Sequence, residues 1–88
     1  MIHYKAIRET LHHADIGSYI SYGIAAYDDK GRLCCLVPDV CPDSGEAAAF
    51  AARCTQEQVE PAQLTDVIED FIGVPYAEYI VNVVHTNT

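Results

Sequence analysis

The stretch from Glu60 to Gly73 is the clearest amphipathic helix in the chain, and the rest of the sequence must supply a surface for its apolar side. Pro61 stands where a first helical residue belongs, because its missing N–H would be unpaired there in any case. Five apolar side chains then recur at helical spacing and form one stripe: Leu64, Val67, Ile68, Phe71 and Ile72. Gly73 and Pro75 follow as stop signals, so the predicted helix ends before Gly73.

The first 37 residues are typical of three strands joined by two turns. Alternation of apolar and polar residues predicts strands over about 2–11 and 18–27, and an apolar run predicts a third over 32–37. Gly23, in the middle of the second strand, indicates a bulge or the close approach of another backbone. The third strand is apolar on both faces, which predicts a central strand or one covered on two sides. Pro38 is expected to end it, since proline cannot donate to a ladder.

A second helix is expected over about 44–54. Asp43, followed three residues later by Glu46, resembles a capping box. The outer face of this helix carries little charge and consists of Ala48, Ala49 and Ala52. Either alanine serves there only as a good helix former, or something packs on that side too. A short connection at 55–59 then predicts a helical hairpin over 43–73.

These elements predict an α+β fold in a single domain over residues 1–88. Strands over 1–37 would form an antiparallel, three- to four-stranded sheet, and the helical hairpin would cover one of its faces, a two-layer βββαα arrangement. The β-branched run at 79–84 predicts a further strand within 74–88, before a frayed tail. That strand would pair either with the sheet of its own chain or with a second copy.

The formal net charge of −8 is unevenly distributed. Residues 1–38 carry four acids and four bases, whereas residues 39–78 carry nine acids and Arg53 as the single base. Nucleic-acid binding is therefore disfavoured, because phosphates require a basic face, and an anionic membrane would repel the chain. A basic protein partner or a cation would be favoured, while the simpler interpretation is that the acids keep a small domain soluble. No signal-peptide or membrane-spanning pattern is present, so a cytoplasmic protein is expected.

The cysteines and histidines form no zinc pattern. Cys34, Cys35, Cys41 and Cys54 include no Cys-x-x-Cys spacing, and no cofactor or metal is predicted from them. Buried free thiols are expected at positions 34, 35 and 54. Cys41, placed in a loop before a helix N-terminus, is the strongest candidate for a reactive thiol, because the helix dipole favours a thiolate.

Two surfaces are candidates for partner binding. Asp66, Glu69 and Asp70 share one face of the predicted second helix, which is either a plain solvated face, a protein-binding patch, or part of a metal or catalytic site. Tyr19 and Tyr27, with Ala25, lie on the face of the sheet that two helices cannot cover, and exposed tyrosines there predict a homodimer. No catalytic or cofactor-binding residue is assigned. Tyr4 and Tyr22 are expected to pack in the core with the hydroxyl at its edge.

Two short motifs carry a resemblance to a known family. Ser-Tyr-Gly-Ile at 21–24 and Leu-Thr-Asp-Val-Ile-Glu-Asp-Phe-Ile at 64–72 resemble a Firmicutes family of short bacterial proteins known only as a domain of unknown function. The resemblance covers roughly residues 2–73. It departs at Gln63, where a histidine is common in that family, and beyond Gly73. It implies a shared pattern that includes Tyr22, Asp66, Glu69 and Asp70, and it implies no activity.

The sequence alone does not name a function. It favours a small cytoplasmic, non-enzymatic interaction or regulatory protein that self-associates and presents an acidic helix face. The alternative is a domain that binds a small molecule or a divalent metal, enzymatic or not, through Asp66, Glu69 and Asp70 together with a histidine.

Overall fold

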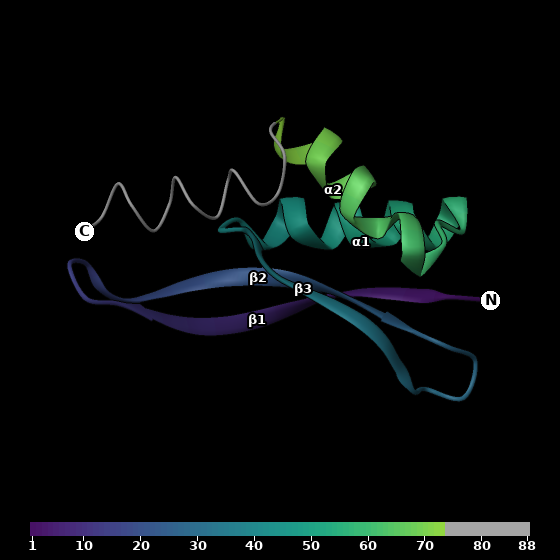
Figure 1. The fold of residues 1–88 in the computed structure, drawn as a ribbon, viewed down its shortest axis with the longest axis horizontal. Coiled ribbons are helices and arrows are strands. Elements are labelled where there is room, and N and C mark those ends of the chain that lie inside the picture. The colour runs from purple at the N-terminus through teal and green to yellow at the C-terminus, as the bar shows by residue number, and fades with distance from the viewer. Residues whose placement is uncertain (74–88) are drawn as a thin grey trace.

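The computed structural model describes residues 1–73. Three antiparallel strands, β1 (His3–His13), β2 (Gly17–Tyr27) and β3 (Leu33–Cys41), form one sheet in the order β1-β2-β3. Helix α1 (Ser44–Glu57), the 3-10 turn η1 (Pro61–Gln63) and helix α2 (Leu64–Ile72) follow. Figure 1 shows both helices on the same side of the sheet. The predicted α+β, two-layer βββαα fold is confirmed, and the strand expected at 79–84 lies outside the described residues.

β2 is the central strand, and its register with β1 is unbroken. The pairs run from His3 opposite Tyr27 to His13 opposite Gly17. Ile24 and Ala26 on β2 face the helices and are fully buried, as the predicted alternation requires. The far end of the β1–β2 hairpin extends beyond α1 (Figure 1). Ile20, which lies near that end, is therefore 42% exposed although it shares the face of Ile24.

The expectations for β3 were wrong in two respects. The strand is an edge strand, with Leu33 and Leu36 exposed, and not a central or doubly covered one. It also does not end at Pro38 but continues to Cys41. Between the pairs Ile24–Val37 and Tyr22–Cys41, β3 has more residues than β2, so Pro38 lies in a β-bulge. Proline is tolerated at such a place because it lies on an edge strand, within a bulge.

Gly23 and Glu9 explain how this bulge is held. A Cβ atom at Gly23 would lie 2.8 Å from the carbonyl oxygen of Val37 and 3.1 Å from the Cα atom of Pro38, so only glycine lets β3 approach. Asp39 has a φ of +53°, and its N–H donates to Glu9 Oε2 at 3.0 Å. The Glu9 side chain of β1 thus extends across the central strand β2 and accepts a hydrogen bond from the bulge of β3. The close backbone approach predicted from Gly23 is confirmed.

The start of α1 and the end of α2 lie at the predicted signals, whereas the end of α1 and the start of α2 do not. Asp43 is the N-cap of α1, and its Oδ1 accepts a hydrogen bond from Glu46 N at 2.8 Å. Gly73 ends α2 with a φ of +82°, and its N–H donates to the carbonyl of Glu69. α1 is longer than predicted and continues to Glu57. The segment at Pro61 forms a 3-10 turn before α2 begins at Leu64.

One core lies between the sheet and the helices. Its buried members are Tyr4, Ile24, Ala26, Val40, Cys41, Ala47, Phe50, Ala51, Cys54, Leu64 and Ile68. The Tyr4 hydroxyl donates to the carbonyl of Val59 at the edge of this core, as expected, and Tyr22 packs against it while partly exposed. Within residues 1–73, no helix is long and apolar enough to cross a membrane.

Candidate functional site

A cleft separates α1 from α2 on the outer side of the helical layer. α2 is anchored by the buried side chains of Leu64 and Ile68. Val67 and Phe71, on the next side of the helix, line the cleft toward α1, and Val67 also packs against the margin of the core. Phe71 stacks on Phe50 of α1 with 4.4 Å between ring centroids and 28° between the ring planes. This contact holds one end of the helices together, and a hollow of about 390 Å³ lies beside it.

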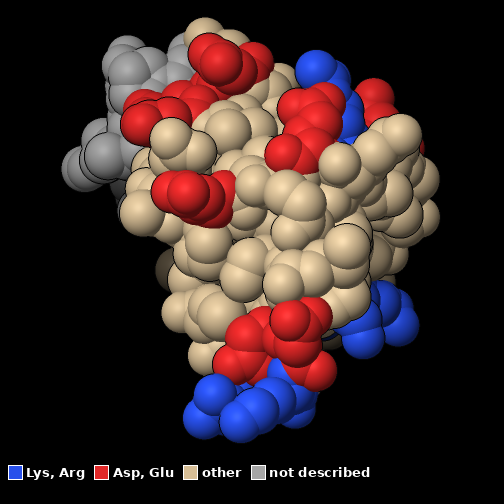
Figure 2. Space-filling view, turned by 90° about the vertical axis from the view of Figure 1, so that its right-hand side faces the viewer, with Lys and Arg blue, Asp and Glu red and all other residues tan. Residues whose placement is uncertain are grey.

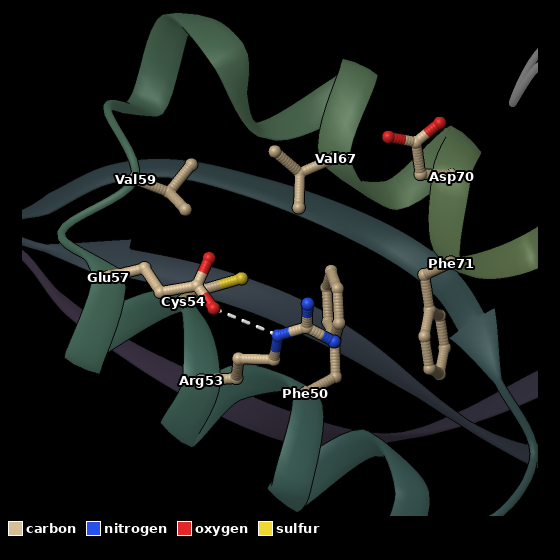
Figure 3. Close-up of a pocket in the computed structure, with 8 residues that line it drawn as sticks. All are labelled: Phe50, Arg53, Cys54, Glu57, Val59, Val67, Asp70 and Phe71. Carbon is tan, nitrogen blue, oxygen red and sulfur yellow. Dashed lines mark hydrogen bonds and ion pairs between the residues drawn. The ribbon is translucent and has the colours of Figure 1, made fainter.

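The walls of the cleft are apolar and its rim is charged. The lining residues are Phe50, Arg53, Cys54 and Glu57 of α1, Val59 of the connection, and Val67, Asp70 and Phe71 of α2. Figure 3 shows the two valines and the two phenylalanines around the hollow, with Asp70 and Glu57 at its borders. Phe71 is 40% exposed, which is high for an aromatic side chain packed against another. The cleft therefore offers an accessible apolar floor.

The charges at the rim leave an excess of carboxylate. Arg53 Nε donates to Glu57 Oε2 at 2.9 Å, an i,i+4 pair on the surface of α1 (Figure 3). Asp70 forms no ion pair within the described part of the chain. The charge of Arg53 is thus balanced by Glu57 of the same helix. The carboxylate of Asp70 remains available to a cation at the opposite border of the cleft.

The surroundings of the cleft are acidic as well. Residues 39–73 contain eight acids and Arg53 as the only base. Figure 2 shows acidic groups spread over the upper, helical side of the molecule, whereas at the lower, sheet side acidic groups lie next to most of the Lys and Arg groups. A second hollow of about 210 Å³, lined by Glu46, Ala49, Phe50, Arg53 and Phe71, adjoins the same aromatic pair. The apolar surface therefore continues along α1 within an acidic field.

Of the three acidic residues predicted on α2, the structure brings one to the cleft. Asp66 and Asp70 are exposed and Glu69 is partly buried, but only Asp70 lines the cleft. Within residues 1–73, no group of three or more His, Cys, Asp and Glu side chains is placed to hold a metal ion. The arrangement in that part of the chain does not favour the metal-binding alternative, which combined Asp66, Glu69 and Asp70 with a histidine.

The two predicted tyrosines lie at opposite ends of β2, and each already has a partner. The Tyr19 hydroxyl donates to Asp39 Oδ2 at 3.2 Å, next to the bulge. The ring of Tyr27 lies under Lys5, whose Nζ is 5.5 Å from the ring centroid. Ala25, between them, is fully buried, because its small side chain lies between those of Lys5 and Leu36 on the flanking strands. The structure thus brings neither tyrosine to the cleft.

The cysteine expectations need two corrections. Cys41 is not in a loop: it is the last residue of β3, 5% exposed, and burial raises the pKa of its thiol. Its Sγ lies 3.6 Å from Glu46 Oε2, so a nearby carboxylate further opposes the thiolate. Cys34 is exposed and not buried, because the second irregularity of β3 lies at that residue. Cys54 is buried as predicted, and burial raises the pKa of its thiol too.

Sequence reasoning singled out Asp70 among the residues of the cleft and missed the other seven, which are Phe50, Arg53, Cys54, Glu57, Val59, Val67 and Phe71. Val67 and Phe71 were interpreted only as part of the apolar stripe of the second helix, and Phe50 of α1 is itself a buried member of the core. The signal that could have located the cleft is the width of that stripe in α2. Leu64, Val67, Ile68, Phe71 and Ile72 span more of the helix surface than a single contact with a sheet needs.

Comparisons with protein-family models, with curated proteins and with solved structures find no match to this chain. The resemblance to the Firmicutes family therefore stays a prediction. The structure shows where its two motifs lie. Residues 21–24 form the part of β2 that lies beside the bulge of β3, and residues 64–72 form α2.

Proposed function

We propose that this chain is a small, non-enzymatic protein-interaction domain that binds a basic segment of a partner protein in the cleft between α1 and α2. The observation that carries the proposal is an accessible apolar floor, made by Phe50, Phe71 and Val67, with the carboxylate of Asp70 at its border. That carboxylate has no ion-pair partner among residues 1–73. A peptide that places an aromatic or large aliphatic side chain next to a lysine or arginine fits both features.

The size and chemistry of the cleft support a peptide over a small metabolite. A volume of about 390 Å³ accommodates one or two side chains of a peptide, and of the charged groups at its rim Arg53 and Glu57 are already paired with each other. The acidic field of residues 39–73 would attract a basic partner and repel an acidic one. Aromatic side chains in such a place are typical anchors of interfaces.

The cleft does not support catalysis as well as it supports binding. The nucleophile available in it is Cys54, which is 2% exposed, and burial raises the pKa of its thiol, so the reactive thiolate is disfavoured. The proposed membership of the Firmicutes family rests on the two sequence motifs and adds no activity. A regulatory role and a location in the bacterial cytoplasm are also part of this proposal, and both rest on the sequence alone.

A displayed library of random short peptides, selected on the purified protein, tests the proposal. We expect the selected peptides to share an aromatic or large aliphatic residue beside Lys or Arg. Their binding should weaken at least about tenfold in Phe71→Ala and in Asp70→Lys, because one substitution removes the floor and the other reverses the charge at the border.

Asp66→Lys is the matched control. It makes the same charge change one turn earlier on the same helix, at an exposed residue that does not line the cleft. Binding should weaken there by only about twofold, through the general field. Peptides that bind Asp70→Lys and Phe71→Ala as tightly as the native protein would place the site elsewhere, and a selection that yields no binder would contradict the proposal.

A further inference from the structure

The outer edge of β1 is open over its second half. In an antiparallel pair, residues alternate between those that exchange hydrogen bonds with the partner strand and those whose backbone groups point away from it. The Tyr4 N–H donates at 2.8 Å to Thr55 Oγ1 of α1 and not to β2. The backbone N–H and carbonyl of Tyr4 therefore point away from β2, and the backbone groups of the other even-numbered residues of β1 do so too.

Two side chains of α1 close the first part of this edge. Thr55 binds the backbone of Tyr4, and Gln58 binds that of Ile2, accepting from its N–H and donating to its carbonyl at 3.0 Å each. Beyond Tyr4, the residues whose backbone groups point away from β2 are Ala6, Arg8, Thr10 and His12. Among the residues that the structure describes, none offers a hydrogen-bond partner to the outward backbone groups of these four.

The opposite edge of the sheet is unsuited to pairing. β3 contains Pro38, which has no N–H, and it is irregular at two places in its register with β2. The N–H of Asp39 is already bound by Glu9. β1, by contrast, runs for 11 residues without a proline or a bulge and keeps one register with β2 throughout. An added strand would therefore find its template on β1.

We propose that the open part of β1 pairs antiparallel with the same segment of a second copy of this chain, so that the two sheets become one continuous sheet. A twofold interface must be self-complementary, and one register pairs all four outward residues. In that register Ala6 lies opposite His12 of the second copy, and Arg8 lies opposite Thr10. The symmetry axis then passes beside Glu9. This inference is independent of the peptide-binding cleft, which lies between the helices.

Charge selects the same register. A shift by one residue on each strand toward the N-terminus would place Arg8 directly opposite Arg8 of the second copy, and like charges in that position destabilise a strand pair. At the axis the two Glu9 residues face each other, but each carboxylate is bound across β2 to Asp39 N at 3.0 Å and so is turned away. On the open face of the sheet, the register sets Ile7 against Leu11, a favourable apolar pair.

The open edge is long enough for a dimer of moderate affinity. Seven paired residues extend about 23 Å along it. An interface of this length lies at the lower limit for specific association, so main-chain hydrogen bonds have to contribute, and we expect a micromolar Kd. Ala52 and Ala48 lie about one and two turns before Thr55 on the exposed outer side of α1, and their small size lets the second copy approach the edge.

Sedimentation analysis of two variants at one exposed position tests the proposal. Thr10→Pro removes an N–H that β2 does not use, so the monomer should fold, while the Kd of the dimer should rise at least about tenfold. Thr10→Val keeps the N–H and changes only the side chain, so its Kd should stay within about twofold of the native value. A protein that is monomeric at about 100 µM would overturn the proposal, and so would a dimer that Thr10→Pro leaves intact.

Amide hydrogen exchange on the native protein gives a second readout that does not depend on a variant. In the dimer, the N–H groups of Ala6, Arg8 and Thr10 should be protected at high concentration and lose that protection on dilution. Their odd-numbered neighbours, bonded to β2, should be protected at every concentration. Protection of the even-numbered residues that does not change on dilution would assign the edge to a segment of the same chain and would also overturn the proposal.

Discussion

The carboxylate of Glu9 on β1 binds the backbone N–H of Asp39 on β3, with 3.0 Å between Oε2 and N, although β2 lies between the two strands. The contact is made over Gly23, whose missing side chain leaves room for it: a Cβ there would lie 3.3 Å from the same oxygen. It fixes Asp39 in a left-handed conformation and directs its carboxylate to the Tyr19 hydroxyl. The side chain of Glu9 thus links β1 to the bulge of β3 across the central strand.

Gly23→Ala tests the close approach of β3. The new methyl group would meet the Val37 carbonyl oxygen at 2.8 Å, and because backbone atoms cannot turn aside, β3 has to move. We expect a loss of about 1–3 kcal/mol in the free energy of unfolding, measured in urea. Gly31→Asn is the control, at a positive-φ turn position with open space around it, and should change stability little. Equal stability of Gly23→Ala and the native protein would contradict the described packing.

Glu9→Ala and Glu9→Gln separate the hydrogen bond from the charge. Alanine removes the acceptor and leaves the N–H of Asp39 without it, which should cost about 1–2 kcal/mol. Glutamine keeps a carbonyl oxygen at the same reach and should retain at least half of that stability. The measurement is urea unfolding at a low protein concentration. If glutamine is as destabilising as alanine, the contribution of Glu9 comes from its charge and not from this bond.

Tyr4 should make the protein sensitive to alkali. Burial, followed by the charge of the neighbouring cysteine thiolates, raises the pKa of Tyr4 from 10.0 to about 12. The folded state therefore holds the phenolic proton more tightly than the unfolded chain, and stability falls as the pH rises wherever that is so. The contribution of Tyr4 is fully present below pH 10 and is lost as the pH rises toward about 12.

Tyr4→Phe isolates this effect. It should cost about 1 kcal/mol at neutral pH, because the bond to the Val59 carbonyl is lost. Between pH 9.5 and about 11.5 its free energy of unfolding should fall less steeply than that of the native protein. The difference between the two slopes removes the contribution of the buried thiols, which both proteins share. Identical slopes would show that the Tyr4 proton is not held by the fold.

Thiol labelling should follow exposure. Cys34 is exposed, whereas Cys41 and Cys54 are buried and burial raises the pKa of both thiols. With a maleimide at neutral pH, we expect Cys34 to react first and the two buried thiols to react only as the protein unfolds. Mass spectrometry of the labelled peptides checks this order. Labelling of Cys41 in the native protein at the rate of Cys34 would contradict its position at the end of β3.

The features that could be predicted from the sequence depend on local chemistry. Asp43 caps α1 and Gly73 ends α2 because each effect involves residues within one turn. β2 was recognised because its two faces differ. The path of β3 beyond Pro38 was missed because it depends on Glu9, which is 30 residues away in the sequence and bonds to Asp39. A proline and a left-handed aspartate are turn signals in isolation, and only the distant carboxylate makes them part of a strand.

The cleft was missed for a related reason. Phe50 and Phe71 each fit the apolar stripe of a helix. Their contact near the surface depends on how α2 is placed relative to α1, which the pattern of a single helix does not determine. The acidic residues were found by composition, but only Asp70 lies at the cleft, since the position of Asp66 and Glu69 depends on how α2 is rotated.

The bulge at Pro38 has a consequence for assembly. A sheet with two matching open edges can add copy after copy and grow into a fibre, as cross-β filaments do. This sheet has one regular edge, β1, and one irregular edge, β3, with a proline and an occupied amide. Once two copies have joined through β1, both ends of the combined sheet are β3 strands, and polymerisation stops. The domain can therefore pair through the edge of β1 without the combined sheet growing into a fibre.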